Sequence, residues 1–596
     1  MDRNTIIAII MITAIMAVWM IMMPPPQAPE PVVEEEQVAS DSIDSTNAAD
    51  LPESASAPVQ EQDVQETIPV HTAREIVVDT DLYTARLSDL GATLIGFELK
   101  EFLQFDQVRQ VQLVDSASRG AIGVEFQSPG SRNIYTRDLL FVQRDSMDVI
   151  NATTAPATVV FEAGIGDGSL QFSYTFSPGD YEVGLEVTHI NPAGFQTSEG
   201  YELVWYGGIP FSEDEHNRKE EITKVGAYAR SGNDVEGITL QGDEWAERVL
   251  RGSVSWVGVK NKYFGAVVVT DRPALEAVLE GERIGDTEDP TVAVNFEAAL
   301  FMGPPSDTPD TFRLYLGPLE YGKIKRYEGA YGIVDYGWDM FEWMTRPLAV
   351  AVFIPVFSFL SSLIPNYGLV IILFCLLIKL VLLPLTLSSY KSMAKMRELQ
   401  PKMQEIKEKY ADNPEKQQQA TIKMYRESGT NPLGACLPMV LQYPIIIALW
   451  QFLQQSIEIR QEGFLWAADL SAPDAILHLP FSIPFYGDFV AGFTVLMGLS
   501  MIVQMRLQAT PTSGPQAKIF MYLMPGIIFV IFNGLPSGLS LYYFCYNVFS
   551  AVQQQFINIS VKKTPDSQKS TVKKVAGRKP VSRVMTGKRR GKKGRR

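Results

Sequence analysis

Residues 367–385 read YGLVIILFCLLIKLVLLPL, an apolar run in which Lys379 is the one charged residue. A helix of this length measures about 28 Å, close to the roughly 30 Å hydrocarbon core of a bilayer. A lysine at that depth costs about 2.5–3.5 kcal/mol even on lenient scales, so its presence indicates a function. We interpret Lys379 as a positive charge in a water-lined groove. The alternative is that its flexible side chain snorkels to the water at the helix end.

Five further apolar runs are expected to cross the membrane, which gives six spans together with 367–385. They cover residues 6–23, 433–453, 489–505, 519–532 and 537–556. Bulky residues end the first run, and this disfavours signal-peptide cleavage, so residues 1–23 are predicted to be a retained anchor. The run 519–532 would form only about 21 Å of helix, which predicts local bilayer thinning unless flanking turns lengthen the helix.

The apolar run 347–364 is predicted to lie on the membrane without crossing it. Pro355 interrupts this run, and only two residues separate it from the next one. A span here would also move every later loop to the side that its charge disfavours. Trp338, Phe341 and Trp343 precede the run, and aromatic residues are common at membrane surfaces. We therefore expect residues 336–366 to form an amphipathic interfacial helix on the outer leaflet.

Charge is separated along the chain, and this separation sets the predicted orientation. Residues 24–346 carry 23 basic and 55 acidic residues, whereas residues 562–596 carry 15 basic residues and one acidic residue. Because basic loops stay in the cytoplasm, the tail 559–596, the loop 388–430 and both termini are placed there. The acidic region is placed on the opposite side. The tail has three possible roles that the sequence leaves open: binding ribosomal RNA, binding anionic lipid, or acting only as a topology signal.

The acidic region divides into a linker and a β domain. Residues 24–70 contain 11 acidic residues and no basic or aromatic residue, which predicts a disordered tether. Over 71–335 the sequence predicts an all-β domain, an antiparallel sandwich. One hairpin is clear, because alternating runs at 170–176 and 181–187 flank a Ser-Pro-Gly-Asp turn. The three cysteines all lie in apolar runs, so no disulfide framework is expected.

The cytoplasmic loop 388–430 is predicted to be a helical hairpin. Apolar residues recur every three or four positions, at Met393, Met396, Leu399, Met403, Ile406 and Tyr410. Asn413 and Pro414 then supply a cap and a first-turn proline for a second helix. The methionines either offer an adaptable surface to apolar client proteins or pack the two helices against each other.

Three motifs in the membrane half carry a resemblance to a known family. They are SMAKMRELQPK at 392–402, NPLGACLP at 431–438 and PSGLSLYY at 536–543. In this order they resemble the signatures of the YidC/Oxa/Alb family of membrane protein insertases. The anchor and large outer domain look like the Gram-negative layout of that family, whose periplasmic domain is a β super-sandwich. The resemblance implies a mixed fold: a polytopic α-helical membrane bundle with five spans in the insertase core 367–558, plus the β domain and the cytoplasmic hairpin.

The same resemblance implies a function and a set of site residues. The function is insertion and folding of inner-membrane proteins through a hydrophilic groove, alone or with the Sec translocon, with the ribosome and lipids as further partners and no cofactor. Lys379 stands where the family usually has arginine, so the charge is kept but the planar fork that grips carboxylates is lost. The other implied groove residues are Gln442, Ser540, Tyr542, Tyr543 and Asn547. Each could instead make an ordinary interhelical hydrogen bond.

The sequence offers little support for competing functions. An intramembrane serine protease would need a histidine near a buried serine, yet His478 is the single histidine of the membrane half and lies in a loop. A transporter typically has several intramembrane ionisable residues or inverted repeats, and neither is apparent. The β-domain fold resembles sugar mutarotases, but its histidines (His71, His189 and His216) form no evident acid–base group. We therefore predict a scaffold domain and a protein that is not an enzyme.

Overall fold

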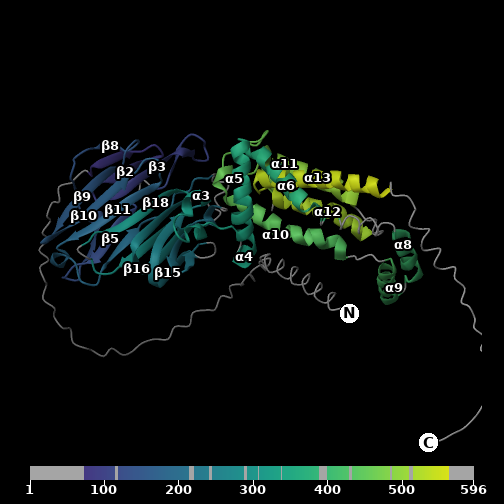
Figure 1. Ribbon diagram of the computed structural model, residues 1–596, viewed down its shortest axis with the longest axis horizontal. Coiled ribbons are helices and arrows are strands. Elements are labelled where there is room, and N and C mark those ends of the chain that lie inside the picture. The colour runs from purple at the N-terminus through teal and green to yellow at the C-terminus, as the bar shows by residue number, and fades with distance from the viewer. Residues whose placement is uncertain are drawn as a thin grey trace, which may run out of the picture. The chain divides into compact units, whose positions relative to one another are not determined.

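The computed structural model describes residues 73–562 apart from 115–118, 214–220, 241–243, 287–291, 306–307, 337–338, 385, 388–398, 412, 429–432, 484–485 and 509–514. The predicted anchor 1–23, the linker 24–70 and the basic tail from 563 onward lie outside the described residues, as do His71, His216, Met393 and Met396. Strands occupy the first part of the described chain and helices the second (Figure 1).

The β domain contains two sheets. In spatial order the smaller sheet comprises β4 (Gln110–Gln112), β3 (Thr93–Leu103), β2 (Tyr83–Ser88), β1 (Glu75–Asp79) and β8 (Val149–Asn151). The larger sheet runs β6 (Asn133–Tyr135), β5 (Ile122–Gln127), β12 (Tyr201–Trp205), β17 (Ala293–Met302), β16 (Phe264–Ile284), β18 (Asp310–Pro318), β11 (Glu182–Ile190), β10 (Gly168–Phe176), β9 (Ala157–Ile165) and β7 (Val142–Gln143). From β16 it also extends through β15 (Trp245–Lys260) to β13 (Gly226–Ser231) and β14 (Asp234–Ile238).

The predicted hairpin is present as β10 and β11. These strands pair antiparallel, with Tyr174 opposite Leu185, and the apolar members of the alternating run point into the core. The Tyr174 hydroxyl donates to the Ala92 carbonyl oxygen at 2.7 Å, which ties the larger sheet to the start of β3. One expectation was wrong: β1 and β8 pair in parallel, so the domain is not wholly antiparallel. A long connection separates these two strands, as parallel pairing requires.

Short helices complete the β domain and its junction with the helical part. They are η1 (Thr136–Asp138), η2 (Pro192–Gly194), α3 (Tyr321–Ile324) and η4 (Ala330–Ile333). The longer helices are α4 (Asp339–Leu348), α5 (Ile354–Leu363), α6 (Tyr367–Val381), α8 (Gln400–Lys409), α9 (Pro414–Glu427), α10 (Leu433–Gln455), α11 (Gly492–Gln508), α12 (Pro515–Phe532) and α13 (Ser537–Lys562), with η6 (Ile457–Ile459) after α10. A two-stranded hairpin, β19 (Ala475–Ile483) and β20 (Gly487–Ala491), precedes α11.

Pro355 does not interrupt the helix as the sequence suggested. A π-helical segment, η5 (Ala349–Phe353), joins α4 to α5, and Pro355 stands in the first turn of α5. The wider turn accommodates a residue that lacks an N–H group, and helix continuity is kept. Phe341–Leu363 is the one helix in the described part of the chain that is long and apolar enough to cross a membrane. It nevertheless crosses the direction of α6, α10, α11 and α13 at a steep angle (Figure 1).

Two other boundaries correct the sequence analysis. The helix expected over 519–532 begins at Pro515, so α12 has 18 residues and measures about 27 Å. The basis for predicting bilayer thinning is therefore lost. The helix expected over 489–505 begins only at Gly492, because the residues before it form β20. A strand was not expected there, since the apolar run shows no alternation with polar residues.

The helical hairpin predicted in the loop 388–430 is present as α8 and α9. The Asn413 side chain accepts the Lys416 backbone N–H at 3.0 Å, and Pro414 opens α9, as the sequence predicted. Met403 of α8 meets the Tyr425 hydroxyl of α9, with 3.5 Å between the oxygen and Sδ. Of the two roles considered for the methionines, packing within the hairpin therefore describes Met403. Met393 and Met396 are not described, and their predicted role stays a prediction.

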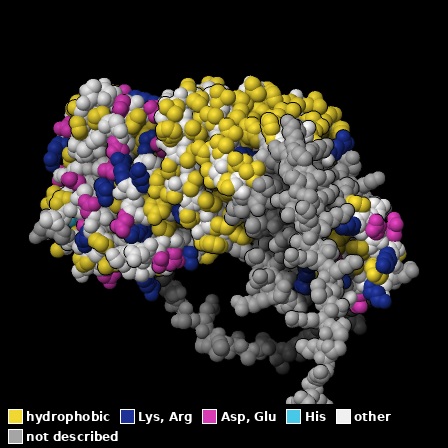
Figure 2. Space-filling model, turned by 45° about the vertical axis from the view of Figure 1, so that its right-hand side comes forward, with side chains coloured by type: hydrophobic (Ala, Val, Ile, Leu, Met, Phe, Trp, Pro, Cys, Tyr) yellow, Lys and Arg dark blue, Asp and Glu magenta, His cyan; other side chains and the backbone are white. Residues whose placement is uncertain are grey.

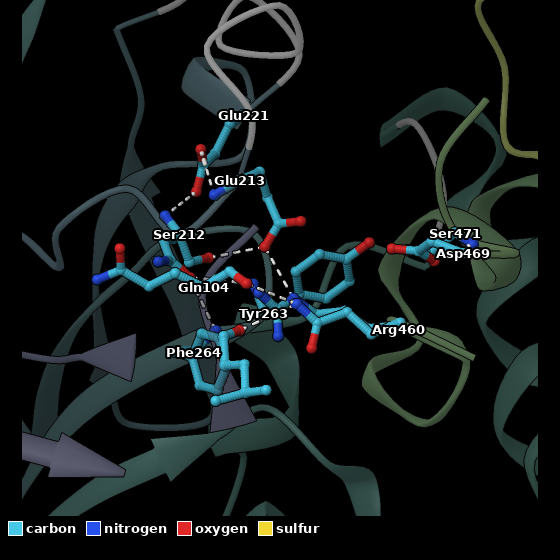
Figure 3. A network of polar contacts seen from close by, with 12 residues as sticks. Gln104, Ser212, Glu213, Glu221, Tyr263, Phe264, Arg460, Asp469 and Ser471 are labelled. Atoms are coloured by element: carbon cyan, nitrogen blue, oxygen red, sulfur yellow. Dashed lines mark hydrogen bonds and ion pairs between the residues drawn. The ribbon is translucent and has the colours of Figure 1, made fainter. Parts of the chain in front are cut away.

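A polar network connects the loop after α10 to the β domain (Figure 3). Arg460, whose side chain is 2 % exposed, lies 2.8 Å from a carboxylate oxygen of Glu213, whose side chain is 12 % exposed. The Arg460 guanidinium also lies 5.6 Å from the centroids of the Tyr263 and Phe264 rings. Gln461 donates to the backbone oxygens of Leu103 and Gln104 at 3.1 and 2.9 Å. These contacts, of which the Arg460–Glu213 pair is the most buried, fix the loop after α10 against β-domain residues.

Candidate functional site

Lys379 lies on α6 and is directed toward α13. Its side chain is buried, with the residue 6 % exposed, whereas Leu376 and Leu380 on the same helix are 40 % and 59 % exposed. Nζ donates a hydrogen bond to the Ser550 hydroxyl and lies 3.2 Å from the centroid of the Tyr546 ring. The ammonium therefore faces the interior of the helical part. It does not point toward the exposed side of α6 that carries Leu376 and Leu380. It also does not extend to the end of the helix, so the snorkelling alternative does not describe Lys379.

Three residues of α13 form the wall opposite Lys379. Tyr542, Tyr546 and Ser550 are spaced by four, which places them on one face of a helix. The Ser550 hydroxyl donates to the Tyr546 carbonyl oxygen at 2.7 Å, so its oxygen is oriented to accept from the ammonium. An aromatic face attracts a cation by about 0.5–2 kcal/mol, depending on desolvation. The wall thus stabilises the ammonium by a hydroxyl and a ring, both uncharged.

No carboxylate pairs with Lys379 in the described part of the chain. A buried ammonium normally acquires a negatively charged partner, because a neutral environment compensates the lost hydration only in part. Lys379 therefore has unused capacity to attract an acidic group.

The neighbouring groups are also polar or incompletely paired. Cys375, one turn before Lys379, approaches the Tyr542 carbonyl oxygen, with 3.8 Å between sulfur and oxygen. The Tyr542 hydroxyl is buried and has no hydrogen-bond partner among the described residues. Burying such a group costs about 1–3 kcal/mol unless another polar group or water satisfies it. Further along, Gln553 donates to the Thr386 hydroxyl at 3.0 Å. Polar groups thus continue along the α6–α13 contact.

The groove residues proposed from the sequence do not all surround Lys379. Ser540 lies 3.0 Å from the Thr494 hydroxyl, and Asn547 donates to the Ser500 hydroxyl at 3.0 Å, so both bind α11. For these two residues the alternative of ordinary interhelical hydrogen bonds describes the structure. Tyr543 packs its ring against Phe532 of α12 at 5.1 Å between centroids. Tyr542 alone of the named α13 residues shares the face that meets Lys379.

Two residues with direct contacts to Lys379 were missed. Tyr546 and Ser550 follow Tyr542 at intervals of four residues, which predicts that all three share one helix face. Both residues lie after the motif 536–543, so the motif did not include them. Gln442 lies within α10, and its side chain is outside the described residues. Its predicted place in the groove stays a prediction.

Comparisons with known proteins match both halves of the chain. The family model described as "YidC periplasmic domain" matches residues 75–351, and that described as "60Kd inner membrane protein" matches 359–564. The membrane protein insertase YidC of Chlorobium phaeovibrioides is 38 % identical over 569 residues, covering 94 % of this chain and 95 % of that protein. The chain belongs to the YidC family of membrane protein insertases.

Other YidC relatives agree over a similar length. YidC of Chloroherpeton thalassium is 37 % identical over 577 residues, covering 95 % of this chain and 97 % of that protein. A solved structure of an active YidC insertase with its first transmembrane domain resolved is 19 % identical, covers 83 % of this chain and 94 % of its own, and has a TM-score of 0.33. Family membership rests on the sequence matches. It confirms the resemblance drawn from the three motifs and places the β domain in the periplasm of an inner-membrane protein.

Proposed function

We propose that this YidC-family chain inserts inner-membrane proteins and helps them fold by receiving their polar segments beside Lys379. The observation that carries the proposal is the buried ammonium between α6 and α13, held by a hydroxyl and a ring with no paired carboxylate among the described residues. An acidic client segment would supply the missing charge. The unpaired Tyr542 hydroxyl adds a polar group that such a segment, or water around it, can satisfy.

The proposed topology has six spans and both termini in the cytoplasm. Residues 1–23 would be the anchor, 24–70 a linker, 71–335 the periplasmic domain and 367–558 the insertase core, with the basic segments 388–430 and 559–596 in the cytoplasm. On the face shown in Figure 2, hydrophobic side chains dominate the helical part next to the β domain, whereas charged residues are scattered over the β domain. The steep crossing of α4–α5 relative to the other helices supports an interfacial placement of 336–366 on the outer leaflet (Figure 1).

The attraction between Lys379 and an acidic client residue can be compared with the cost of inserting that residue. An aspartate at the centre of a spanning helix costs about 2.5–3.5 kcal/mol to insert on translocon scales. A carboxylate about 4 Å from an ammonium gains about 4 kcal/mol at an effective dielectric constant of about 20. The attraction is of the same size as the cost, so one buried lysine can offset the cost of bringing one acidic residue partway across. The client's apolar helix would meanwhile enter lipid along the outside of the bundle, driven by about 0.8 kcal/mol per buried CH₂ group.

The proposed partners follow from this role. Nascent inner-membrane proteins are the clients, received alone or together with the Sec translocon. The basic tail would contact the ribosome or anionic lipid, and Met393 and Met396 would contact apolar clients. We infer no enzymatic activity and assign the β domain a scaffold role. His189, which could have served a sugar-binding site, is buried between the Phe195 and Tyr201 rings.

The test is insertion by purified full-length protein in liposomes. Two single-span clients would be compared, identical except that one carries acidic and the other neutral residues in the translocated segment. Lys379→Glu should block the acidic client and leave the neutral client largely unaffected, because attraction becomes repulsion of similar size. Lys379→Arg should insert both clients, since it keeps the charge.

The matched control is Leu380→Glu, which adds a carboxylate at the next position but on the exposed side of α6. It should not discriminate between the two clients. Normal insertion of the acidic client by Lys379→Glu would contradict the proposed role of the groove charge.

A further inference from the structure

The hairpin β19–β20 exposes a row of apolar side chains. Ile476, Leu477, Phe481 and Ile483 are 57, 56, 61 and 38 % exposed. From Leu477 to Ile483 apolar residues alternate with His478, Pro480 and Ser482, and every residue of β19 except Leu479 is exposed, so the apolar face of the strand is uncovered. Between 475 and 491 the only charged residue is Asp488, which is exposed. Exposed apolar surface of this kind marks an interaction site, since soluble hairpins cover at least one face.

The hairpin is held firmly at its base, so its exposure reflects a fixed structure. Asn533, fully buried in the turn between α12 and α13, accepts the Ala491 N–H at 3.0 Å. It also donates to the carbonyl oxygens of Tyr486 and Phe489 at 3.1 and 2.8 Å.

The other side of the base is tied through Asp474. Its carboxylate accepts the Phe493 N–H at 2.7 Å, at the start of α11, and the Trp466 indole N–H at 2.8 Å. Together Asp474 and Asn533 set the hairpin at the end of the bundle where α11 begins, α12 ends and α13 begins.

The apolar surface of the hairpin continues into that of the helices. The Tyr486 ring lies 5.5 Å from the ring of Phe529 on α12, between centroids. On the same helix Ile527 and Ile531 are 42 and 54 % exposed. Surface that is continuous with the lipid-facing side of a spanning helix contacts the same medium. In the proposed topology α12 spans the membrane, so this medium is the lipid bilayer. Trp466, 48 % exposed beside the hairpin base, is of the type found at membrane–water interfaces.

The backbone limits how deep the hairpin can lie. Within the described residues β19 and β20 form a sheet of two strands, which leaves one edge of each strand without backbone partners. Unpaired N–H and C=O groups are not tolerated in the hydrocarbon core. They are tolerated at the headgroup level, where water reaches the edges while apolar side chains enter the acyl boundary.

We propose that β19–β20 is a membrane-interface element that seats in the outer leaflet at headgroup depth and holds the outer ends of α11 and α12 there. Its partner is the lipid bilayer and not a polypeptide. This inference rests on the proposed topology, in which the start of α11 faces the periplasm. In this position the apolar side chains of the hairpin contact the acyl boundary, while its unpaired strand edges and Asp488 contact water and lipid headgroups.

The experiment places a fluorescent dansyl amino acid at the Phe481 position of the full-length protein in liposomes. Quenching is measured with lipids carrying a nitroxide near the headgroup, lipids carrying it near the chain end, and aqueous iodide. We expect stronger quenching by the shallow than by the deep nitroxide, a blue-shifted emission, and weak quenching by iodide. Two control positions are Val142 in β7, 71 % exposed, for water and Leu376 on α6 for hydrocarbon.

Each result decides the question. Iodide quenching at Phe481 as strong as at Val142, stronger quenching by the deep nitroxide, or shielding from all three quenchers would each overturn the proposal. Shielding would identify a protein partner in place of lipid. If the Leu376 probe shows deep-nitroxide quenching while the Phe481 probe fails, only the hairpin inference is lost. If the Leu376 probe is also quenched by iodide alone, the proposed topology fails with it.

Discussion

Replacing Arg460 by alanine should destabilise the full-length protein strongly, because it leaves Glu213 as a buried carboxylate. Both side chains are nearly inaccessible, and their 2.8 Å contact lies beside the Tyr263 and Phe264 rings. Removing one partner of a buried pair costs about 3–5 kcal/mol. Arg251 and Glu276 form a pair of similar length, 2.9 Å, but the Arg251 side chain is 82 % exposed. An exposed pair contributes about 0–1 kcal/mol, so Arg251→Ala is the matched control.

The assay is thermal unfolding of the purified protein in detergent, followed by tryptophan fluorescence. Arg460→Ala should lower Tm by on the order of 10 °C, and Arg251→Ala by no more than a few degrees, at roughly 2–4 °C per kcal/mol. The double variant Arg460→Met with Glu213→Gln should recover most of the loss, since neither replacement side chain leaves a buried charge. Equal shifts for Arg460→Ala and Arg251→Ala, or no recovery in the double variant, would refute the assignment of a buried coupling pair.

Three further predictions follow from individual contacts. Burial lowers the pKa of His189 from 6.5 to about 4. The neutral imidazole therefore contributes fully to the free energy of unfolding above pH 6.5, and this contribution, roughly 3 kcal/mol, is lost as the pH falls toward 4. Urea titrations across this pH range should show the loss in the original protein and not in His189→Leu. Asn533→Ala should speed hydrogen exchange at the Ala491 amide by leaving it buried without an acceptor, whereas Asn533→Asp should protect it; equal exchange in both variants would contradict the anchoring role. A double-mutant cycle of thermal unfolding with Tyr546→Leu and Lys379→Met should give a coupling of about 0.5–2 kcal/mol, and zero coupling would show that the ring does not hold the ammonium.

Local patterns predicted the parts of the fold in which neighbouring residues decide the structure. The alternation at 170–176 gave the β10–β11 hairpin, and Asn413 gave the start of α9. Pro355 misled, because a π-helical turn that absorbs a proline leaves no simple mark in the sequence. The β19–β20 hairpin was not anticipated although residues 477–483 alternate between apolar and other residues, because Pro480 within this run argues against a strand.

The site was predictable only in part, because it depends on which face of α13 turns toward α6. The motifs named Ser540, Tyr542 and Asn547 together, although positions 540 and 547 lie on a different side of the helix from 542. In the structure the side with Ser540 and Asn547 contacts α11, and the side with Tyr542 faces Lys379. Arg460 had no visible partner in the sequence, as Glu213 is 247 residues away and reaches it only through the tertiary fold.

The central claim, that client polar segments pass beside Lys379 on the inner face of α13, is tested most directly by photo-crosslinking. A photoreactive amino acid at the Ser550 position faces Lys379, and the same residue at the Val552 position, 49 % exposed, faces the outer surface of the same helix. With a translation-arrested client whose acidic segment is halfway inserted, position 550 should crosslink to that segment and position 552 to lipid or to the client's apolar helix. Crosslinks from the acidic segment to position 552 and none to position 550 would contradict the account.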